Sequence, residues 1–412
     1  MKQLLHEYHR VLTIGQARLV LGATVGSLIG DVMAMVALLL HLHDRGHGPY
    51  AVMTLLICFA LPLVLTMGLA GSVADSHPPR LVLLVALSAQ AVGALGLVMA
   101  PSLVWTCIGV LVMQTGFAFA MPVWNAVMPL VVGDELSGTY VSLAQGLRAV
   151  ASPLGAALAG VVVQQWGTRA ALGVNAATFL AVIAAALALR VNRSTVESRH
   201  SLLPRDGLRV LRADPVMSAL VLGVIPIILT LEAVNAVEVF LVRGELGASP
   251  AQFGLAEAAG GVGAVVGAFA AAALRTRDDR VRAILIGLAV VPLLQIGQGL
   301  APEVWVYAVA AFAVGLALGV VNAAIFALLL REIAEGDRGK VLALVSGLSR
   351  TATIGALAIG GVLGTQVGAR TAYVVCGVVG LLIAATAALR VRAGVHRSVD
   401  DVSTRRSVRQ RT

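Results

Sequence analysis

Four acids and two arginines lie inside long apolar segments of the chain: Asp31, Glu232, Glu238, Glu257, Arg148 and Arg350. An ionised side chain at the centre of a lipid bilayer costs about 2.5–3.5 kcal/mol on insertion scales, so each of these groups needs a partner, a proton or water. Carboxyl groups in such positions can take up and release protons, and arginines can pair with acids or with anions. These side chains are therefore the first candidates for function.

Asp31 lies on one face of its segment together with Thr24 and Ser27, at spacings of i, i+3 and i+7. A buried carboxyl group that is protonated near neutral pH could couple transport to protons or bind a cation. The alternative is a carboxyl group that packs against a neighbouring helix and is hydrogen-bonded to it. The residue pattern is compatible with both interpretations.

Glu232, Asn235 and Glu238 are three residues apart, so on one helix they cover an arc of about 120° and can line one wall of a cavity. Glu232 lies nearest the middle of the segment and is the stronger candidate for proton coupling, whereas Glu238 lies near its external end and is expected to be solvated. Glu257 lies about two turns into the next segment. Its alternative role is an ion pair with Arg243 or simple solvation.

Arg148 and Arg350 occupy similar depths in their segments, at a spacing near 200 residues, about two turns from the cytoplasmic face. They could pair with the acids inside the membrane or attract an anionic substrate. Alternatively, both side chains could extend to the lipid headgroups on the cytoplasmic side.

The composition explains why charges in these segments are unusual. Of the 412 residues, 58% are hydrophobic and only 12% are charged, against about 25% in an ordinary soluble domain. This composition excludes a soluble globular enzyme. Because a membrane helix needs about 20 apolar residues, the apolar content suffices for about twelve spans. We expect them at 19–42, 49–70, 80–100, 102–132, 139–163, 169–190, 215–242, 250–274, 282–300, 303–330, 340–366 and 370–390.

The net charge of +9 indicates the orientation of these spans. If both termini are cytoplasmic, most of the 30 basic residues lie in cytoplasmic segments. The external loops then hold only Arg45, Arg169, Arg243 and Arg370. This asymmetry follows the positive-inside rule and predicts cytoplasmic termini. The basic residues orient the protein and contact membrane lipid, so nucleic-acid binding is not expected.

A polar stretch at 191–214 separates two similar halves. Val104-Trp105 recurs as Val304-Trp305, and Gly155 recurs as Gly355. Such a parallel repeat is typical of one group of secondary transporters. We therefore predict an all-α membrane protein with two pseudo-symmetric halves of six helices each. The predicted regions are an N-terminal half (1–190), a cytoplasmic linker (191–214), a C-terminal half (215–391) and a basic cytoplasmic tail (392–412).

The loop between the second and third expected spans resembles a known motif. Its residues Gly71, Asp75 and Arg80 stand in the order of the G-x-L-x-D-R-x-G-R-[RK] loop of the major facilitator superfamily, although Ser76 and Pro78 depart from that pattern. The resemblance implies a gating role for this loop, with fewer charges than usual.

The first expected span narrows the resemblance to one branch of the superfamily. Its run Ser27-Leu28-Ile29-Gly30-Asp31 is similar to the S-x-x-G-D pattern of the enterobactin-exporter-like and macrolide-efflux branch. In the superfamily, the first, fourth, seventh and tenth helices line a central cavity. This implies a substrate cavity lined by polar, aromatic and methionine side chains together with the two arginines: Asn125, Asn235, Asn322, Gln114, Phe117, Met121, Trp124, Arg148 and Arg350.

The resemblance implies proton-coupled efflux of an amphipathic organic compound, such as a drug, siderophore or secondary metabolite, by alternating access in the bacterial inner membrane. One alternative is a proton-coupled or facilitative importer of a small nutrient. A more remote alternative is a receptor or scaffold that uses a transporter fold. In the first case the chain is an antiporter of the multidrug-resistance type, works as a monomer and needs no cofactor besides the proton gradient.

Other motifs fail on closer inspection. The glycines Gly261, Gly263 and Gly267 look like a dinucleotide fingerprint, but they lie inside an apolar span, follow no strand and are one residue too widely spaced, so we expect close helix packing. No phosphate-binding loop is present. The histidines near residue 45 lack a helical i, i+4 pair, and the cysteines lie singly in apolar runs, so no metal site and no enzymatic nucleophile are expected.

Overall fold

Apolar segments of this length form helices because lipid offers no partner to backbone polar groups. A computed structural model of the chain describes residues 2–100, 102–189, 215–332, 335–386 and 389. Its first half contains α1 (Lys2–Thr13), α2 (Gly15–Asp44), α3 (Pro49–Leu65), α4 (Met67–Ser76), α5 (Pro79–Val98), α6 (Leu103–Val132), α7 (Asp134–Trp166) and α8 (Thr168–Ala188). Its second half contains α10 (Pro215–Asn235), the π-helix η1 (Phe240–Glu245), α11 (Pro250–Ala270), η2 (Ala271–Ala273), α12 (Arg277–Gly299), α13 (Val304–Glu332), α14 (Glu335–Val367) and a last helix over Ala369–Thr386.

These helices match most of the expected spans. Within the described residues, nine helices are long and apolar enough to cross a membrane, and the pair Pro49–Leu65 and Gly68–Ser76, bent by 52°, makes a tenth if it crosses as one span. α10 and α14 lie on the two remaining expected segments. The prediction of an all-helical membrane protein is confirmed. Twelve spans and cytoplasmic termini stay predictions.

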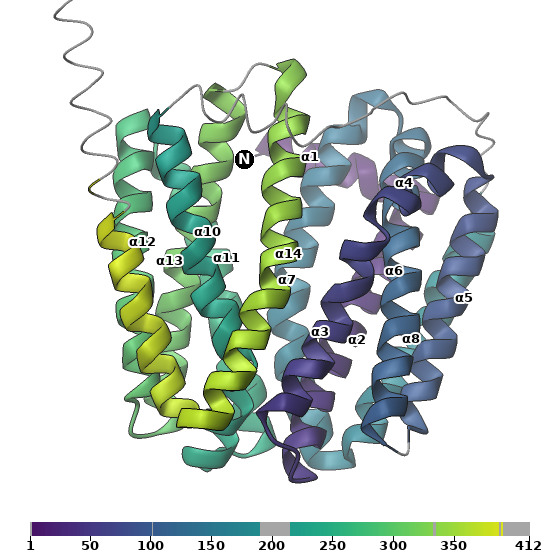
Figure 1. Cartoon of the computed structure of the whole chain (residues 1–412). Helices are drawn as coiled ribbons and strands as arrows, with labels where there is room; N and C mark the ends of the chain where they lie inside the picture. Colours follow the sequence, from purple (N-terminus) through teal and green to yellow (C-terminus); the bar gives the residue numbers. More distant parts are fainter. Residues whose placement is uncertain (1, 101, 190–214, 333–334, 387–388, 390–412) are drawn as a thin grey trace, which may run out of the picture.

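The helices form two bundles (Figure 1). Helices α1 to α8 make one bundle, and α10 to α14 with the last helix make the other. The predicted linker (191–214) and basic tail (392–412) lie outside the described residues, so the proposed boundaries stay predictions. In Figure 1, α1 lies near one end of the molecule, and the loop between α2 and α3 lies at the opposite end. We call that opposite end the far side.

The contacts between the bundles repeat. α7 packs on α11, where Gly160 and Gly254 lie against each other, and α3 packs on α14, where Met53 lies against Gly361. A shift of about 200 residues converts the first pair of helices into the second. The two interfaces are therefore formed by equivalent helices of the two halves, as expected for a parallel repeat.

Small residues also set the spacing inside the second bundle. α11 and α13 approach so closely that a Cβ atom on Gly263 would collide with the Phe312 carbonyl, and one on Gly319 would collide with the Ala264 carbonyl. Gly267 faces the Leu316 carbonyl in the same way. These glycines of α11 thus serve close helix packing, as expected from the sequence.

An ion pair joins the two bundles on the far side. Arg243 Nη2 lies 2.8 Å from Asp44 Oδ1, and Arg243 Nη1 donates to the Ala248 carbonyl. Asp44 ends α2 in the first bundle, whereas Arg243 lies on η1 in the second. Glu245 on the same π-helix pairs with Arg370 of the last helix at 2.8 Å. The far side is therefore held by charged groups as well as by packing.

We expect Asp44→Asn to raise the population in which the far side is open. The Asp44 side chain is 45% exposed, so the loss of its ion pair changes the overall stability by less than about 1 kcal/mol. It nevertheless removes a contact that exists only while the two bundles touch. Double electron–electron resonance between spin labels at positions 47 and 303, in a variant without native cysteines, should show more of the longer distances.

The control for this experiment is Glu135→Gln. It breaks the exposed ion pair of Glu135 with Arg10, at 2.9 Å, which joins α7 to α1 within the first bundle. Its distance distribution should match that of the parent protein. If the distance distribution of Asp44→Asn is also unchanged, the Asp44–Arg243 ion pair does not keep the far side closed.

Candidate functional site

In the described part of the chain, candidate residues line a cavity in each bundle. The amino-terminal cavity has a volume of about 320 Å³ and lies among α2, α6 and α7. The carboxy-terminal cavity has a volume of about 380 Å³ and lies among α10, α11 and α13, with further side chains from α12 and the last helix. Both volumes are at the lower end of the range for small-molecule sites, about 300–1,000 Å³.

The carboxy-terminal cavity brings together most of the acids proposed from the sequence. Glu232, Glu238 and Glu257 all line it, and so do Asn235 and Asn322. No lysine or arginine is among its lining residues in the part of the chain that the structure describes. The cavity is therefore acidic and has no counter-charge of its own.

A break in the helix carries Glu238 to this position. The expected continuous span over 215–242 is wrong, because α10 ends at Asn235 and the chain continues through a turn into the π-helix η1. Two backbone hydrogen bonds, donated by the amides of Phe240 and Leu241 to the same Val237 carbonyl, mark the change of winding. π-Helical turns are rare and are frequent at functional sites. Glu238 consequently leaves the helical arc of Glu232 and Asn235 and turns toward α11 and α13.

Glu238 is the centre of a hydrogen-bonded group. The Tyr307 hydroxyl donates to Glu238 Oε1 at 2.5 Å and lies 2.9 Å from the Tyr373 hydroxyl. Glu238 and Glu257 also interact directly through their side chains. Two carboxylates that touch each other repel unless one of them carries a proton. The arrangement can therefore hold a proton between α11 and the segment that follows α10.

These contacts correct two expectations. Glu238 was expected to be solvated near the external end, but it is hydrogen-bonded to a tyrosine that is only 1% exposed. An ion pair of Glu257 with Arg243 was the alternative role for Glu257, but Arg243 pairs with Asp44 instead. Both differences arise because the helix break turns Glu238 inward and places Arg243 between the bundles, where its mostly buried side chain reaches Asp44.

Two amides complete the polar wall of this cavity. Asn235 Nδ2 donates to Glu232 Oε2 at 3.2 Å, which gives the third acid a hydrogen-bond partner on its own helix. Gln298 of α12 also lines the cavity and is only 6% exposed. Among the described residues its side chain has no hydrogen-bond partner, so its amide is available to a ligand or to water.

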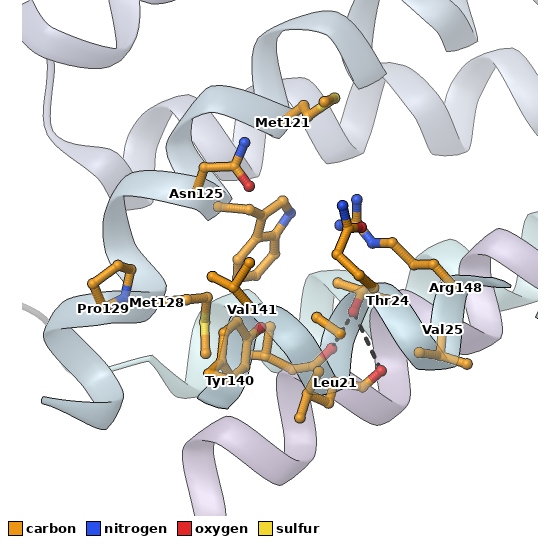
Figure 2. Close-up of a pocket in the computed structure, with 14 residues that line it drawn as sticks. Leu21, Thr24, Val25, Met121, Asn125, Met128, Pro129, Tyr140, Val141 and Arg148 are labelled. Atoms are coloured by element: carbon orange, nitrogen blue, oxygen red, sulfur yellow. Dashed lines mark hydrogen bonds between the residues drawn. The ribbon is translucent and has the colours of Figure 1, made fainter. Parts of the chain in front are cut away.

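The amino-terminal cavity has the opposite character (Figure 2). Among the described residues that line it, Arg148 is the only charged one, and none is an acid. Its walls come from apolar, aromatic and sulfur-containing side chains together with Asn125: Met121, Trp124, Met128 and Tyr140. Thr24 also lines the cavity, but its hydroxyl group donates to the Val20 carbonyl of its own helix.

Arg148 lies deeper in its helix than expected. α7 begins at Asp134 rather than near residue 139, because Asp134 and Glu135 in its first turn suit the positive end of the helix dipole. Arg148 is therefore about 21 Å from the start of a helix about 50 Å long, or about four turns rather than two. In the described part of the chain, its guanidinium group has no hydrogen bond and no ion pair with an acid.

Asp31 lines neither cavity. It lies where α2 packs on α8, beside Asn175, which is 1% exposed and whose Oδ1 atom lies against Gly30. Asp31 Oδ1 is buried and has no hydrogen-bond partner among the described residues. Both interpretations of Asp31 made from the sequence therefore stay open. The structure separates it from the other acids.

Three further candidates are not at the cavities. Gln114, Phe117 and Arg350 line neither of them. In the loop with the superfamily motif, Gly71 and Asp75 lie on α4, and Arg80 lies in the first turn of α5. Arg80 Nη2 donates to the Leu187 carbonyl at the end of α8, at 3.2 Å, so it ties this loop to its own bundle.

Sequence reasoning missed the two buried tyrosines. The chain has only five tyrosines, and four of them, Tyr307 and Tyr373 included, lie inside expected spans. A rare polar ring at such positions was a usable signal, because buried tyrosine hydroxyls find a hydrogen-bond partner. Their convergence on Glu238 could not be read from the sequence, because it depends on the break after α10.

The described residues contain no group of three or more histidine, cysteine, aspartate or glutamate side chains that could hold a metal ion. His43, one of the histidines near residue 45, instead lies 3.3 Å from Asp44.

Comparisons with known proteins place these cavities in a family context. Residues 12–411 match the family model described as transmembrane secretion effector. A relative from Bacillus subtilis (strain 168), the uncharacterized MFS-type transporter YfiS, is 24% identical over 384 residues, which cover 90% of this chain and 91% of that protein.

Solved structures show the same fold. The nucleoside transporter NupG superposes with a TM-score of 0.70 at 12% identity and covers 91% of this chain and 99% of its own. A bacterial homologue of the iron transporter ferroportin, in an inward-facing state, also has a TM-score of 0.70, at 15% identity, and covers 90% of this chain and 98% of its own. At these identities the likeness concerns the fold.

Proposed function

Because the chain belongs to the transmembrane secretion effector family of the major facilitator superfamily, we propose that it is a proton-coupled exporter of an amphipathic organic compound. Candidate substrates are drugs, siderophores and secondary metabolites. The energy comes from the proton gradient across the bacterial inner membrane, with the α1 end of the molecule in the cytoplasm.

The observation that carries the proposal is the carboxyl pair of Glu238 and Glu257. Both acids face a cavity inside the second bundle, and the described part of that cavity holds no basic side chain. A proton bound to the pair removes the repulsion between the two carboxylates, and release of that proton restores the repulsion. A pair that links two different helical segments thus makes their packing depend on protonation.

The packing between the bundles supports alternating access. The Gly160–Gly254 contact, the Met53–Gly361 contact and the Asp44–Arg243 ion pair all lie toward the far side. In this arrangement the far side is closed, and access from the α1 side is favoured. Rocking of the two halves about the paired α7–α11 and α3–α14 interfaces would then expose the cavities to the other side.

Export is preferred because secretion is the activity that the family description states. One of the solved structures with this fold is a nucleoside transporter and another is an iron-transporter homologue, so the fold by itself is compatible with either direction. An importer remains the competing outcome of the experiment below.

The test uses everted membrane vesicles in which respiration acidifies the interior and quenches a pH-sensitive acridine dye. A panel of amphipathic anions, cations and neutral compounds is added in turn. A compound that enters by antiport lets protons leave, so the fluorescence recovers in vesicles that contain the protein and not in vesicles without it. If no compound causes recovery, while intact cells accumulate one of them, the proposal of export is wrong and import is supported.

A further inference from the structure

We propose that the amino-terminal cavity is an organic-anion site in which Arg148 binds the anionic group of the transported compound. This inference rests on the proposed function and deepens it, because it names the chemical class of the substrate. It also assigns substrate and proton to different halves: the substrate to the cavity of the first bundle, and the proton to the acids of the second.

The charge of the cavity carries the first step. Arg148 is the only charged side chain among its lining residues, and in the described part of the chain no acid neutralises it. A cation inside a membrane protein is costly unless it has a partner or water. Arg148 is exposed, so its guanidinium group is accessible to a ligand as well as to water. A guanidinium group binds carboxylate, sulfonate or phosphate oxygens through two parallel hydrogen bonds, so an anionic ligand in the cavity can replace this water.

The walls of the cavity carry the second step. Trp124 is 8% exposed and lines the cavity together with Met121 and Tyr140. Aromatic rings offer large flat contacts, and methionine side chains adapt to irregular shapes. Arg148 on α7 and Trp124 on α6 line the same cavity, and Figure 2 shows the Arg148 side chain among the residues that form its walls. The matching ligand has one anionic group and an apolar, preferably aromatic, body.

The acids carry the third step. Glu232, Glu238 and Glu257 line the other cavity, where an anion would be repelled, so the two charges of the transport cycle are separated between the bundles. Moving an anion outward is also favoured by a membrane potential that is negative inside. Export of an anion thus uses both components of the proton-motive force.

The experiment compares two fluorescent probes of nearly identical shape. 8-Anilinonaphthalene-1-sulfonate carries a sulfonate, whereas N-phenyl-1-naphthylamine lacks it. Binding is measured by titration of the purified protein in phosphatidylcholine nanodiscs without a pH gradient, with empty nanodiscs as the blank. We expect the parent protein to bind the sulfonate about tenfold more tightly than the neutral probe, the range of one charge-assisted hydrogen-bonded pair.

The variants identify the residue. Arg148→Gln should lose the preference for the sulfonate probe, because only the binding of that probe becomes weaker. Arg148→Lys keeps the charge and should retain most of the preference. The matched control is Arg18→Gln, because Arg18 is an exposed arginine on α2 that does not line the cavity. If Arg148→Gln binds both probes as the parent protein does, or if Arg18→Gln has the same effect, the proposal is overturned.

A lipid headgroup has the same chemistry as an organic anion, so one arm separates the two. Nanodiscs with phosphatidylglycerol should leave sulfonate binding unchanged if the cavity serves a soluble substrate. Displacement of the sulfonate by this lipid would assign the cavity to lipid and overturn the substrate class. Because no pH gradient is applied, a negative binding result would not contradict proton-coupled export. A negative transport result would likewise not contradict the binding of the anion in this cavity.

Discussion

Replacing Glu257 with glutamine should abolish proton-driven transport while the protein still folds. Glutamine has the shape of a protonated glutamic acid, and its amide can still donate a hydrogen bond to Glu238. In this variant the contact with Glu238 therefore always has the form that it has when position 257 is protonated. The contact no longer depends on protonation. We expect recovery of dye fluorescence in everted vesicles to fall by about two orders of magnitude, the usual loss for a positioned proton carrier.

The same variant should keep every property that needs no proton. Sulfonate binding in the amino-terminal cavity should equal that of the parent protein, because Glu257 lines only the other cavity. The matched control is Glu303→Gln, since Glu303 is exposed and lies just before α13. Full proton-driven transport by Glu257→Gln would remove the carboxyl pair from the mechanism.

Tyr307→Phe tests the hydrogen bond to the pair. Its hydroxyl donates to Glu238 at 2.5 Å, and its ring is 1% exposed, so phenylalanine keeps the packing and removes one donor. We expect the pH at which transport is half-maximal to shift, with folding retained. A structural role alone would lower the amount of folded protein without moving that midpoint.

Gly319→Val should prevent the second bundle from assembling. A Cβ atom at Gly319 would collide with the carbonyl group of Ala264 on α11, and backbone at a helix interface cannot rotate away as a flexible side chain can. Overpacking of a well-packed core typically costs about 1–3 kcal/mol and occasionally more, a large share of the stability of a typical domain. We expect little monodisperse protein in fluorescence-detected size-exclusion chromatography, and a much lower thermal midpoint for what remains.

The matched control is Gly297→Val on α12. This glycine is exposed, and a Cβ atom there has no neighbour within 4 Å. Both variants have the same helix propensity change, so a difference between them reports the interface and not the helix. Equal yields and midpoints in the two variants would contradict the proposed close packing of α11 on α13.

Much of the fold could be read from the sequence, because its determinants are local. Apolar runs of spanning length form helices in lipid whatever surrounds them, and the repeat near 200 residues indicated two similar halves. The glycines of α11 were also correctly assigned to packing. The helix over 2–13 was not foreseen, because its apolar residues are too few for a span.

The candidate site could be read only in part. The sequence identified Glu232, Glu238 and Glu257 from the cost of a charge in lipid, and Arg148 from the same argument. It gave the acids one common helical wall, since periodicity assumes an unbroken helix. Glu232, Asn235 and Glu238 do line one cavity, but the helix is broken after Asn235, and Glu238 is hydrogen-bonded to Tyr307, which periodicity could not show.

Residue types and their order were enough to establish a helical membrane protein with charges that demand partners, because the penalty for a charge in lipid depends on the residue and not on its neighbours. Which charges meet was decided by the packing of the bundles. Arg243 joined Asp44 instead of Glu257, Asp31 was set apart beside Asn175, and the acids and Arg148 came to line separate cavities. Such meetings depend on helix breaks and on contacts between residues far apart in the chain, which no local pattern encodes.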